Sequence, residues 1–135
     1  NRAYGKNGFL QYQFVIPFGK EREAYNEFLD LVSGSGLSSF LTVMKTFGDI
    51  ESPGMMSFPR PGVNMAIDFR MTGKKTLLLL NELDRVVRDA GGGFYPAKDA
   101  RMSSQDFKGF YPRWKEFLEY KDPKFSSSFW RRVTG

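Results

Sequence analysis

Residues 10–17 read LQYQFVIP, and the order of apolar and polar side chains in this stretch decides the fold. Side chains of a β-strand point alternately to its two faces. Tyr12 and Phe14 therefore share one face. Gln11 and Gln13 share the other. We predict a strand with one face buried in a core and one face that presents amide groups.

Residues 63–70 repeat this pattern. Met65 and Ile67 fall on an apolar face, and Asn64 and Asp68 fall on the opposite face. Two further strands are predicted for residues 38–48, rich in Thr, Val and Phe, and for the short pair 94–95 before Pro96. The face of the second strand that carries Lys45 is ambiguous, because both of its faces hold apolar residues. A surface lysine whose stem covers apolar neighbours stays an alternative there.

Helical spacing of apolar residues appears in residues 20–33 and 75–90. Gly34 is expected to end the first helix. In the second helix, Asp84 and Arg88 are spaced to form an i,i+4 ion pair. Residues 49–62, rich in proline, form a long loop. Residues 103–120 are expected to form one or two aromatic-rich helices broken near Pro112, followed by an exit segment, DPKFSSSFWRRV.

The predicted order is strand, helix, strand, strand, helix, strand, which is the split β-α-β arrangement of ferredoxin-like α+β domains. We expect a four-stranded, largely antiparallel sheet with two helices on one face and extra C-terminal helices. Because the apolar side chains must meet the helices, Gln11, Gln13 and Asn64 should lie together on an open face. Such a face has the character of a ligand-site wall.

Composition excludes several kinds of chemistry. The chain of 135 residues has no cysteine and no histidine, which excludes disulfides, thiolate catalysis, histidine triads and the usual zinc sites. We therefore predict no metal site. The net charge is +5, but the basic residues are dispersed, so nucleic acid is not an expected partner. An RNA-recognition module is also disfavoured, because Tyr12 and Phe14 should face the helices.

No apolar run approaches the roughly 20 residues that span a bilayer. We expect a cytoplasmic protein, with membrane association left open. The chain begins at Asn1 rather than Met, which suggests a fragment or a processed product. We interpret residues 1–8 as a linker or a trimmed end and residues 9–135 as the domain.

Five segments, in this order, carry a resemblance to a known family. They are GFLQYQFVIP, SFLTVMKTFG, SFPRPGVNMAIDF, DAGGGFYPAKDAR and DPKFSSSFW. Together they resemble the C-terminal half of the decaprenylphosphoryl-ribose oxidase group, within the vanillyl-alcohol-oxidase superfamily of FAD enzymes. One departure is Ala66, where actinobacterial members carry a cysteine. That position is not needed for the chemistry, so the difference bears on close orthology alone.

The resemblance implies a substrate-binding cap domain, with the flavin-binding domain absent from this chain and the chain inactive alone. FAD is the implied cofactor, and the implied reaction is oxidation of a secondary alcohol of a sugar or polyol by hydride transfer to FAD. Implied partners are that substrate, which could be phosphate- or lipid-linked, the protein's own flavin domain, and a short-chain reductase acting on the keto product. The alternatives are an aldonolactone or alditol oxidase domain and a free-standing small-molecule-binding module.

The resemblance also implies site residues, by matched position. Lys98 would lie beside the flavin and the reacting carbon, where a fixed cation stabilises charge on the reduced ring. Tyr95 matches a catalytic pocket tyrosine. Gln11 would contact the flavin edge or substrate. The expected substrate-binding residues are Gln11, Gln13, Lys45, Phe47 and Asn64. Arg60, Arg101, Arg131 and Arg132 could contact a phosphate, although a structural or solvated role is favoured.

Overall fold

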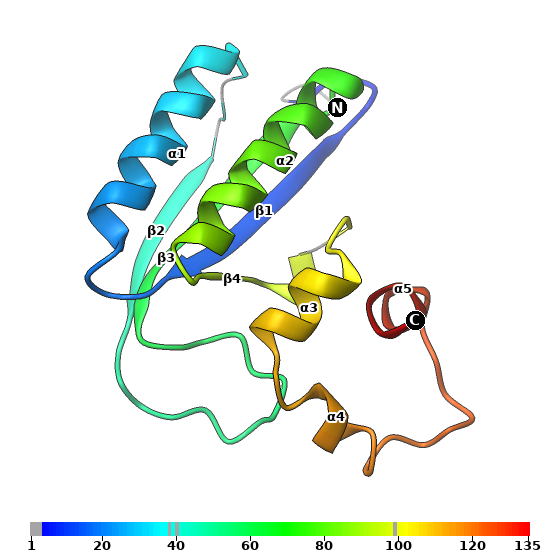
Figure 1. The fold of residues 1–135 in the computed structure, drawn as a ribbon. Helices are drawn as coiled ribbons and strands as arrows, with labels where there is room; N and C mark the ends of the chain where they lie inside the picture. The colour runs from blue at the N-terminus through cyan, green and yellow to red at the C-terminus, as the bar shows by residue number, and fades with distance from the viewer. Residues whose placement is uncertain (1–3, 38, 40, 99) are drawn as a thin grey trace.

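The two stretches with alternating side chains form the two central strands of one sheet (Figure 1). The computed structural model describes residues 4–37, 39, 41–98 and 100–135. In chain order its elements are β1 Phe9–Ile16, α1 Glu21–Ser35, β2 Thr42–Phe47, β3 Gly62–Arg70, α2 Lys74–Asp89, β4 Gly93–Phe94, the 3-10 turn η1 Pro96–Lys98, α3 Ser104–Phe110, α4 Trp114–Phe117 and α5 Ser128–Thr134.

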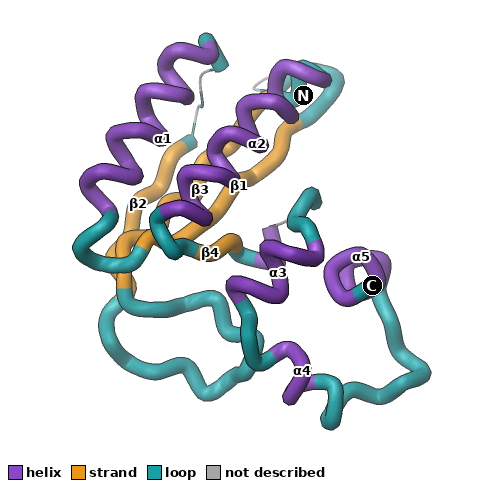
Figure 2. The backbone as a smooth tube through the Cα atoms, viewed as in Figure 1, coloured by secondary structure: helices purple, strands orange, loops and turns teal. Residues whose placement is uncertain are grey.

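The strand order across the sheet is β2-β3-β1-β4, and every pairing is antiparallel (Figure 2). β1 pairs with β3 along its whole length, from Phe9 opposite Arg70 to Ile16 opposite Val63. β4 is much shorter and pairs with β1 only at Phe14 and Val15. The order of elements and the order of strands confirm the predicted ferredoxin-like α+β fold.

Both long helices cover the same face of the sheet, as predicted (Figure 1). Phe14 of β1 packs against Phe28 of α1 with the ring centroids 4.8 Å apart. Leu80 and Leu83 of α2 join the same core and are almost fully buried. Full burial of each such side chain stabilises a fold by roughly 1.5–3 kcal/mol. The apolar faces of β1 and β3 therefore hold the two helices.

The first helix ends later than predicted. α1 continues through Gly34 to Ser35, and Gly36 follows it with a φ of +66°. The residue after a helix often adopts this left-handed conformation, which glycine reaches at little cost. Gly36 therefore ends the helix, and the assignment of that role to Gly34 was wrong.

The C-terminal region packs around Phe107 of α3. Two helices, α3 and α4, lie on either side of Pro112, which confirms the predicted break. The second half of the exit segment lies in a helix, α5, that was not predicted. The Ser127 side chain caps this helix by accepting a hydrogen bond from the Trp130 backbone N–H. The Trp130 ring packs edge-on against Phe107, with centroids 5.9 Å apart.

The N-terminal segment also contacts the sheet. The Tyr4 ring stacks on Phe9 with centroids 4.3 Å apart, and the Tyr4 hydroxyl donates to the Asp68 carboxylate at 2.7 Å. Within the described residues, no helix has the length and apolar character to cross a membrane. That same part of the chain contains no group of three or more Asp and Glu residues arranged to hold a metal ion.

The join between α2 and β4 leaves no room for a side chain at Gly92. A Cβ atom there would lie 2.5 Å from the Val15 carbonyl oxygen and 2.9 Å from Val87. We predict that Gly92→Ala lowers the free energy of unfolding by about 1–3 kcal/mol, the usual cost of overpacking. Urea unfolding of the chain measures this.

Gly109→Ala is the matched control, because a Cβ atom at Gly109 in α3 meets no atom within 4 Å. This variant should be neutral or stabilising by up to about 1 kcal/mol. Equal unfolding midpoints for the two variants would contradict the packing described here.

Candidate functional site

The sheet face opposite the helices carries a row of polar side chains joined across β1 and β3. The Gln11 amide nitrogen donates to Asp68 Oδ1 at 2.9 Å. The Gln13 amide nitrogen donates to Asn64 Oδ1, also at 2.9 Å. Among the described residues, the side-chain carbonyl oxygens of both glutamines have no hydrogen-bond partner. Each can accept a hydrogen bond from a ligand hydroxyl.

This face is not open along its whole length. Phe58, from the loop after β2, stacks on Tyr95 with centroids 4.7 Å apart and meets Phe47 edge-on at 5.8 Å. Phe47 lies on edge strand β2, and Tyr95 directly follows β4 at the opposite edge. A ring that contacts both must lie across the strands between them. The prediction of an open face was therefore wrong at this end, where Asn64 and Val15 have no exposed surface.

Asn64 is an unusual residue for such a position. Its side chain is completely buried, and within the part of the chain that the structure describes its amide nitrogen has no hydrogen-bond partner. An unsatisfied buried donor costs roughly 1–3 kcal/mol. Its amide oxygen holds Gln13 in place. In this structure Asn64 can orient Gln13, but it is not accessible to a ligand.

Four predicted site residues meet at a small cavity beside β1. Gln11, Gln13, Tyr95 and Lys98 all line it. They come together because β4 is only two residues long, so the chain after it turns along the unpaired part of β1. The cavity has about 30 Å³, far less than the roughly 300–1,000 Å³ of a small-molecule pocket. This cavity alone therefore does not enclose a ligand.

Lys98 is one of two cations that line this cavity, and the other is Arg101. Lys98 ends the single turn η1, and its backbone N–H donates to the Tyr95 carbonyl at 3.1 Å. The side chain is exposed, and its amine has no ion pair or hydrogen bond with the described residues. A cation in this state is available to an anionic or electron-rich group.

The other two predicted residues lie apart from this cavity. Lys45 and Phe47 are on edge strand β2, where Lys45 pairs in register with Asn64. Lys45 is exposed, and neither residue lines the cavity at β1. The link between the two groups is the Gln13–Asn64 hydrogen bond, together with Phe58 between Phe47 and Tyr95.

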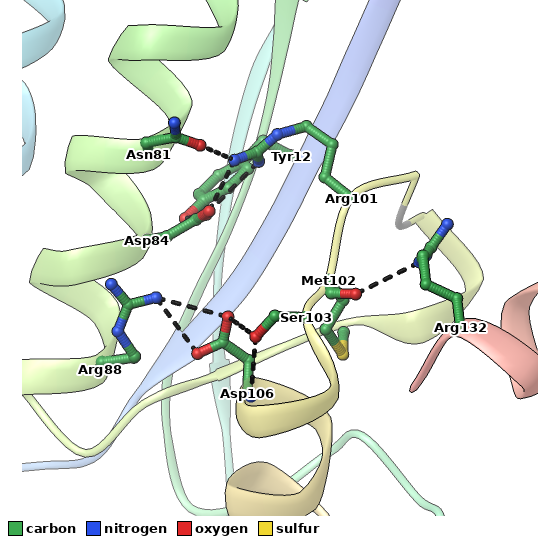
Figure 3. A network of polar contacts seen from close by, with 9 residues as sticks. All are labelled: Tyr12, Asn81, Asp84, Arg88, Arg101, Met102, Ser103, Asp106 and Arg132. Atoms are coloured by element: carbon green, nitrogen blue, oxygen red, sulfur yellow. Dashed lines mark hydrogen bonds and ion pairs between the residues drawn. The ribbon is translucent and has the colours of Figure 1, made fainter. Parts of the chain in front are cut away.

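Two ion pairs join α2 to the chain beyond Lys98 (Figure 3). Asp84 pairs with Arg101 at 2.6 Å, and Arg88 pairs with Asp106 at 3.1 Å. The predicted pair between Asp84 and Arg88 was wrong, because the chain after β4 returns along α2 and offers each of them a long-range partner. Burial raises the pKa of the Asp84 carboxyl above its ordinary value, although the Arg101 guanidinium opposes this shift.

The arginines weighed as phosphate ligands have structural contacts. Arg132 donates to the carbonyl oxygens of Met102 and Ala100 at 3.3 and 3.1 Å. Arg131 donates to the Ser126 carbonyl. Arg60 donates to the Phe58 carbonyl, and its guanidinium lies 5.3 Å from the centre of the Tyr111 ring. These contacts agree with the favoured structural role.

Three residues of this region were not predicted as site residues, namely Phe58, Asp68 and Asp84, and Arg101 was considered only as a possible phosphate contact. Asp68 had a usable signal, because it lies on the same strand face as Asn64. Phe58 and Arg101 had none, since each reaches the site from a loop whose path no local pattern defines. Asp84 had a misleading signal, namely its helical spacing to Arg88.

The fold and the site together define a ferredoxin-like α+β domain with a small cavity at the edge of β1, lined by polar side chains and an exposed lysine. The chain is 40% identical, over 98% of its length, to decaprenylphosphoryl-β-D-ribose oxidase of Mycolicibacterium smegmatis. It is 29% identical, over 93% of its length, to an uncharacterised protein of Streptomyces coelicolor encoded in the mprA 5′ region. The comparison confirms the predicted resemblance.

The chain spans about a third of the length of these relatives, 29% of the first and 35% of the second. No protein-family model matches it. The similarity therefore relates this chain to a part of a larger oxidase, and the incomplete cavity agrees with a site that other residues complete.

The raised pKa of Asp84 predicts a pH dependence of stability. Because the pKa of the folded state lies above that of the unfolded state, stability is lost as the pH rises and Asp84 ionises. Asp84→Asn removes this titration. We predict that wild type and variant have similar unfolding free energies at low pH, and that wild type loses stability relative to the variant above about pH 3.9.

Urea unfolding of both chains at several pH values between acid and neutral measures the difference. The other carboxylates titrate in both chains and cancel in the comparison. A wild type that gains stability relative to Asp84→Asn as the pH rises would show that attraction to Arg101 outweighs burial.

Proposed function

We propose that this chain is the substrate-binding part of an FAD-dependent oxidoreductase, and that the whole protein oxidises a secondary alcohol of a sugar or polyol by hydride transfer. The observation that carries the proposal is the exposed Lys98 at one cavity with Gln11 and Gln13. The 40% identity to a segment of decaprenylphosphoryl-β-D-ribose oxidase supports the same reaction class.

The residues at the cavity fit one edge of a flavin. FAD, when bound, supplies the hydride acceptor, and its ring gains negative charge near N1 and the C2 carbonyl on reduction. The exposed Lys98 amine is a positive group without a partner among the described residues, as this role requires. Gln11 lies beside it and offers a hydrogen-bonding side chain to the same edge. These two residues are the proposed contacts to the flavin.

The same cavity supplies contacts for a polyhydroxylated substrate. The Gln13 carbonyl oxygen can accept a hydrogen bond from a sugar hydroxyl, while Asn64 holds the Gln13 amide nitrogen. Tyr95 lines the cavity next to Lys98 and is fixed by stacking on Phe58. We assign Tyr95 to the wall of the reaction site.

Lys45 and Phe47 extend the proposed surface toward β2. The exposed Lys45 amine is suited to a phosphate group, and the Phe47 ring gives an apolar wall. A sugar linked through phosphate to a lipid would have both kinds of group. The name of the relative suggests this substrate class, which would also account for a cation at the far end of the sheet face.

Two alternatives use the same residues differently. An aldonolactone or alditol oxidase would place a free polyol at Gln11 and Gln13 and would not need Lys45. A free-standing binding module would need an enclosed pocket, and the small cavity at β1 disfavours it. Comparing flavin reduction by decaprenylphosphoryl-β-D-ribose and by free alditols distinguishes the two oxidases.

The role of Lys98 predicts a kinetic effect in the full-length enzyme. Lys98→Ala should slow flavin reduction by about 10²-fold or more, the scale of losing one preorganised electrostatic group. Gln13→Ala should mainly raise KM, because its hydrogen bond is equally strong in the ground and transition states. Anaerobic stopped-flow reduction by decaprenylphosphoryl-β-D-ribose measures both effects.

Lys20→Ala is the matched control, since Lys20 is an exposed lysine at the start of α1 and away from the polar sheet face. Thermal melting of each variant checks folding. If Lys98→Ala reduced its flavin at the wild-type rate, the proposed role of Lys98 would be lost.

The proposal that flavin is held mainly by the rest of the protein predicts how the isolated chain behaves. We expect this chain, purified alone, to be colourless after gel filtration with excess FAD, because it offers only one edge contact. The full-length protein should retain flavin and be yellow. Stoichiometric flavin on the isolated chain, measured by absorbance at about 450 nm, would contradict the proposed division.

A further inference from the structure

Lys98 is the last residue of the single turn η1. Between η1 and α3, the described residues form neither helix nor strand. A lysine that must meet a ligand at a defined point needs its backbone held by other contacts, because a loop without them samples many positions. The contacts of Ala100, Arg101 and Met102 therefore help to fix where Lys98 lies.

Arg101 makes the first of these contacts. Its guanidinium donates to Asp84 Oδ2 at 2.6 Å and to Asn81 Oδ1 at 2.6 Å, one helical turn apart on α2 (Figure 3). Both members of the ion pair are mostly buried, with 20% of the Arg101 side chain and 15% of the Asp84 side chain exposed. Because the guanidinium is planar and donates to two acceptors on α2, it fixes both the orientation of Arg101 and its distance from the helix.

The same carboxylate also holds β1. The Tyr12 hydroxyl donates to Asp84 Oδ1 at 2.9 Å, and Tyr12 lies between Gln11 and Gln13 in the strand. One mostly buried carboxylate therefore connects the strand that carries the glutamines with the segment that carries the lysine. Asp84, Arg101 and Tyr12 also line the cavity where Gln11, Gln13 and Lys98 meet.

A second set of contacts holds the far side of the segment. Asp106 pairs with Arg88 and accepts a hydrogen bond from the Ser103 hydroxyl at 2.8 Å. Arg132 of α5 donates to the carbonyls of Met102 and Ala100. These contacts attach the segment to α3 and α5, whereas Arg101 attaches it to α2 and, through Asp84, to β1.

Stability alone does not account for the Asp84–Arg101 pair. Burial raises the pKa of Asp84 despite the adjacent guanidinium, so the ionised pair is held at a cost to the fold. Buried ion pairs are often no more stabilising than apolar residues of similar volume, while they do require a defined geometry.

We propose that Asp84 and Arg101 are positioning residues that hold Lys98 beside Gln11 and Gln13 by joining its segment to α2 and to Tyr12 of β1. The inference rests on the function proposed above for Lys98. It adds that the lysine is effective only while this connection is intact.

The test is a double-mutant cycle in the full-length enzyme, comparing wild type, Arg101→Ala, Lys98→Ala and the double variant. If Arg101 acts through Lys98, Arg101→Ala slows anaerobic flavin reduction by decaprenylphosphoryl-β-D-ribose by about 10-fold or more. In the Lys98→Ala background the same change should alter the rate by less than about 2-fold. Arg113→Ala, which removes an exposed arginine paired with Glu116, is the control and should leave the rate unchanged.

A second readout does not depend on turnover. The Lys98 amide, bonded to the Tyr95 carbonyl, should exchange its hydrogen faster in Arg101→Ala than in wild type, while core amides of β1 and β3 should not change. If Arg101→Ala does not fold, Asp84→Asn is the substitute, because it keeps the shape of the side chain and removes the charge. It should give the same pattern with a smaller effect.

The outcomes separate the two proposals. A wild-type rate in Lys98→Ala would remove the proposed role of Lys98 and this inference with it. A slow Lys98→Ala enzyme together with a fast Arg101→Ala enzyme would overturn only the positioning role. The positioning role would also be overturned if Arg101→Ala slowed both backgrounds by the same factor, or left Lys98 amide exchange unchanged.

Discussion

The pairing of β1 with β3 in a single register is the constraint on which the rest of the structure depends. In this register Phe14 lies opposite Met65 and faces the helices, while Gln13 lies opposite Ala66 and beside Asn64 on the other face. A slip of one residue would exchange the faces of a strand, placing glutamine amides in the core and aromatic rings on the polar face. The pairing therefore determines both the core and the polar face. When the apolar side chains of β1 pack against α1 and α2, the glutamines must point to the opposite face.

Local periodicity was enough to predict the central strands and the second helix from the sequence. The alternation in β1 and β3 indicates half-buried strands, and the spacing in α2 indicates an amphipathic helix. The succession of these elements along the chain predicts the strand order. Apart from the end of α1, the errors lie where position depends on contacts distant in sequence. Phe58 covers Asn64 because a loop folds back across the sheet, and α5 forms because Trp130 packs on Phe107. Neither contact leaves a periodic signal.

The ion pairs of α2 are a second case in which local spacing did not predict the contact. Spacing favoured a surface pair between Asp84 and Arg88, an interaction worth only about 0.3–0.5 kcal/mol. The folded chain instead gives each residue a partner from the returning segment, and the Asp84 pair is mostly buried. Strand alternation predicted Gln11 and Gln13, and matched motifs predicted Tyr95 and Lys98, and the structure brings these four residues together. It leaves Lys45 and Phe47 on the other edge, so a ligand that contacts all six must be long.

The central claim is that the polar sheet face beside Lys98 is one wall of a flavin site that the rest of the protein completes. A crystal structure of the full-length protein with FAD bound tests it most directly. We predict that the Lys98 amine lies within about 3.5 Å of the flavin N1 or C2 carbonyl oxygen, close to a charge-assisted hydrogen-bond distance, with Gln11 on the same side of the ring. A flavin bound elsewhere in the protein, with the Lys98 amine in solvent, would contradict it.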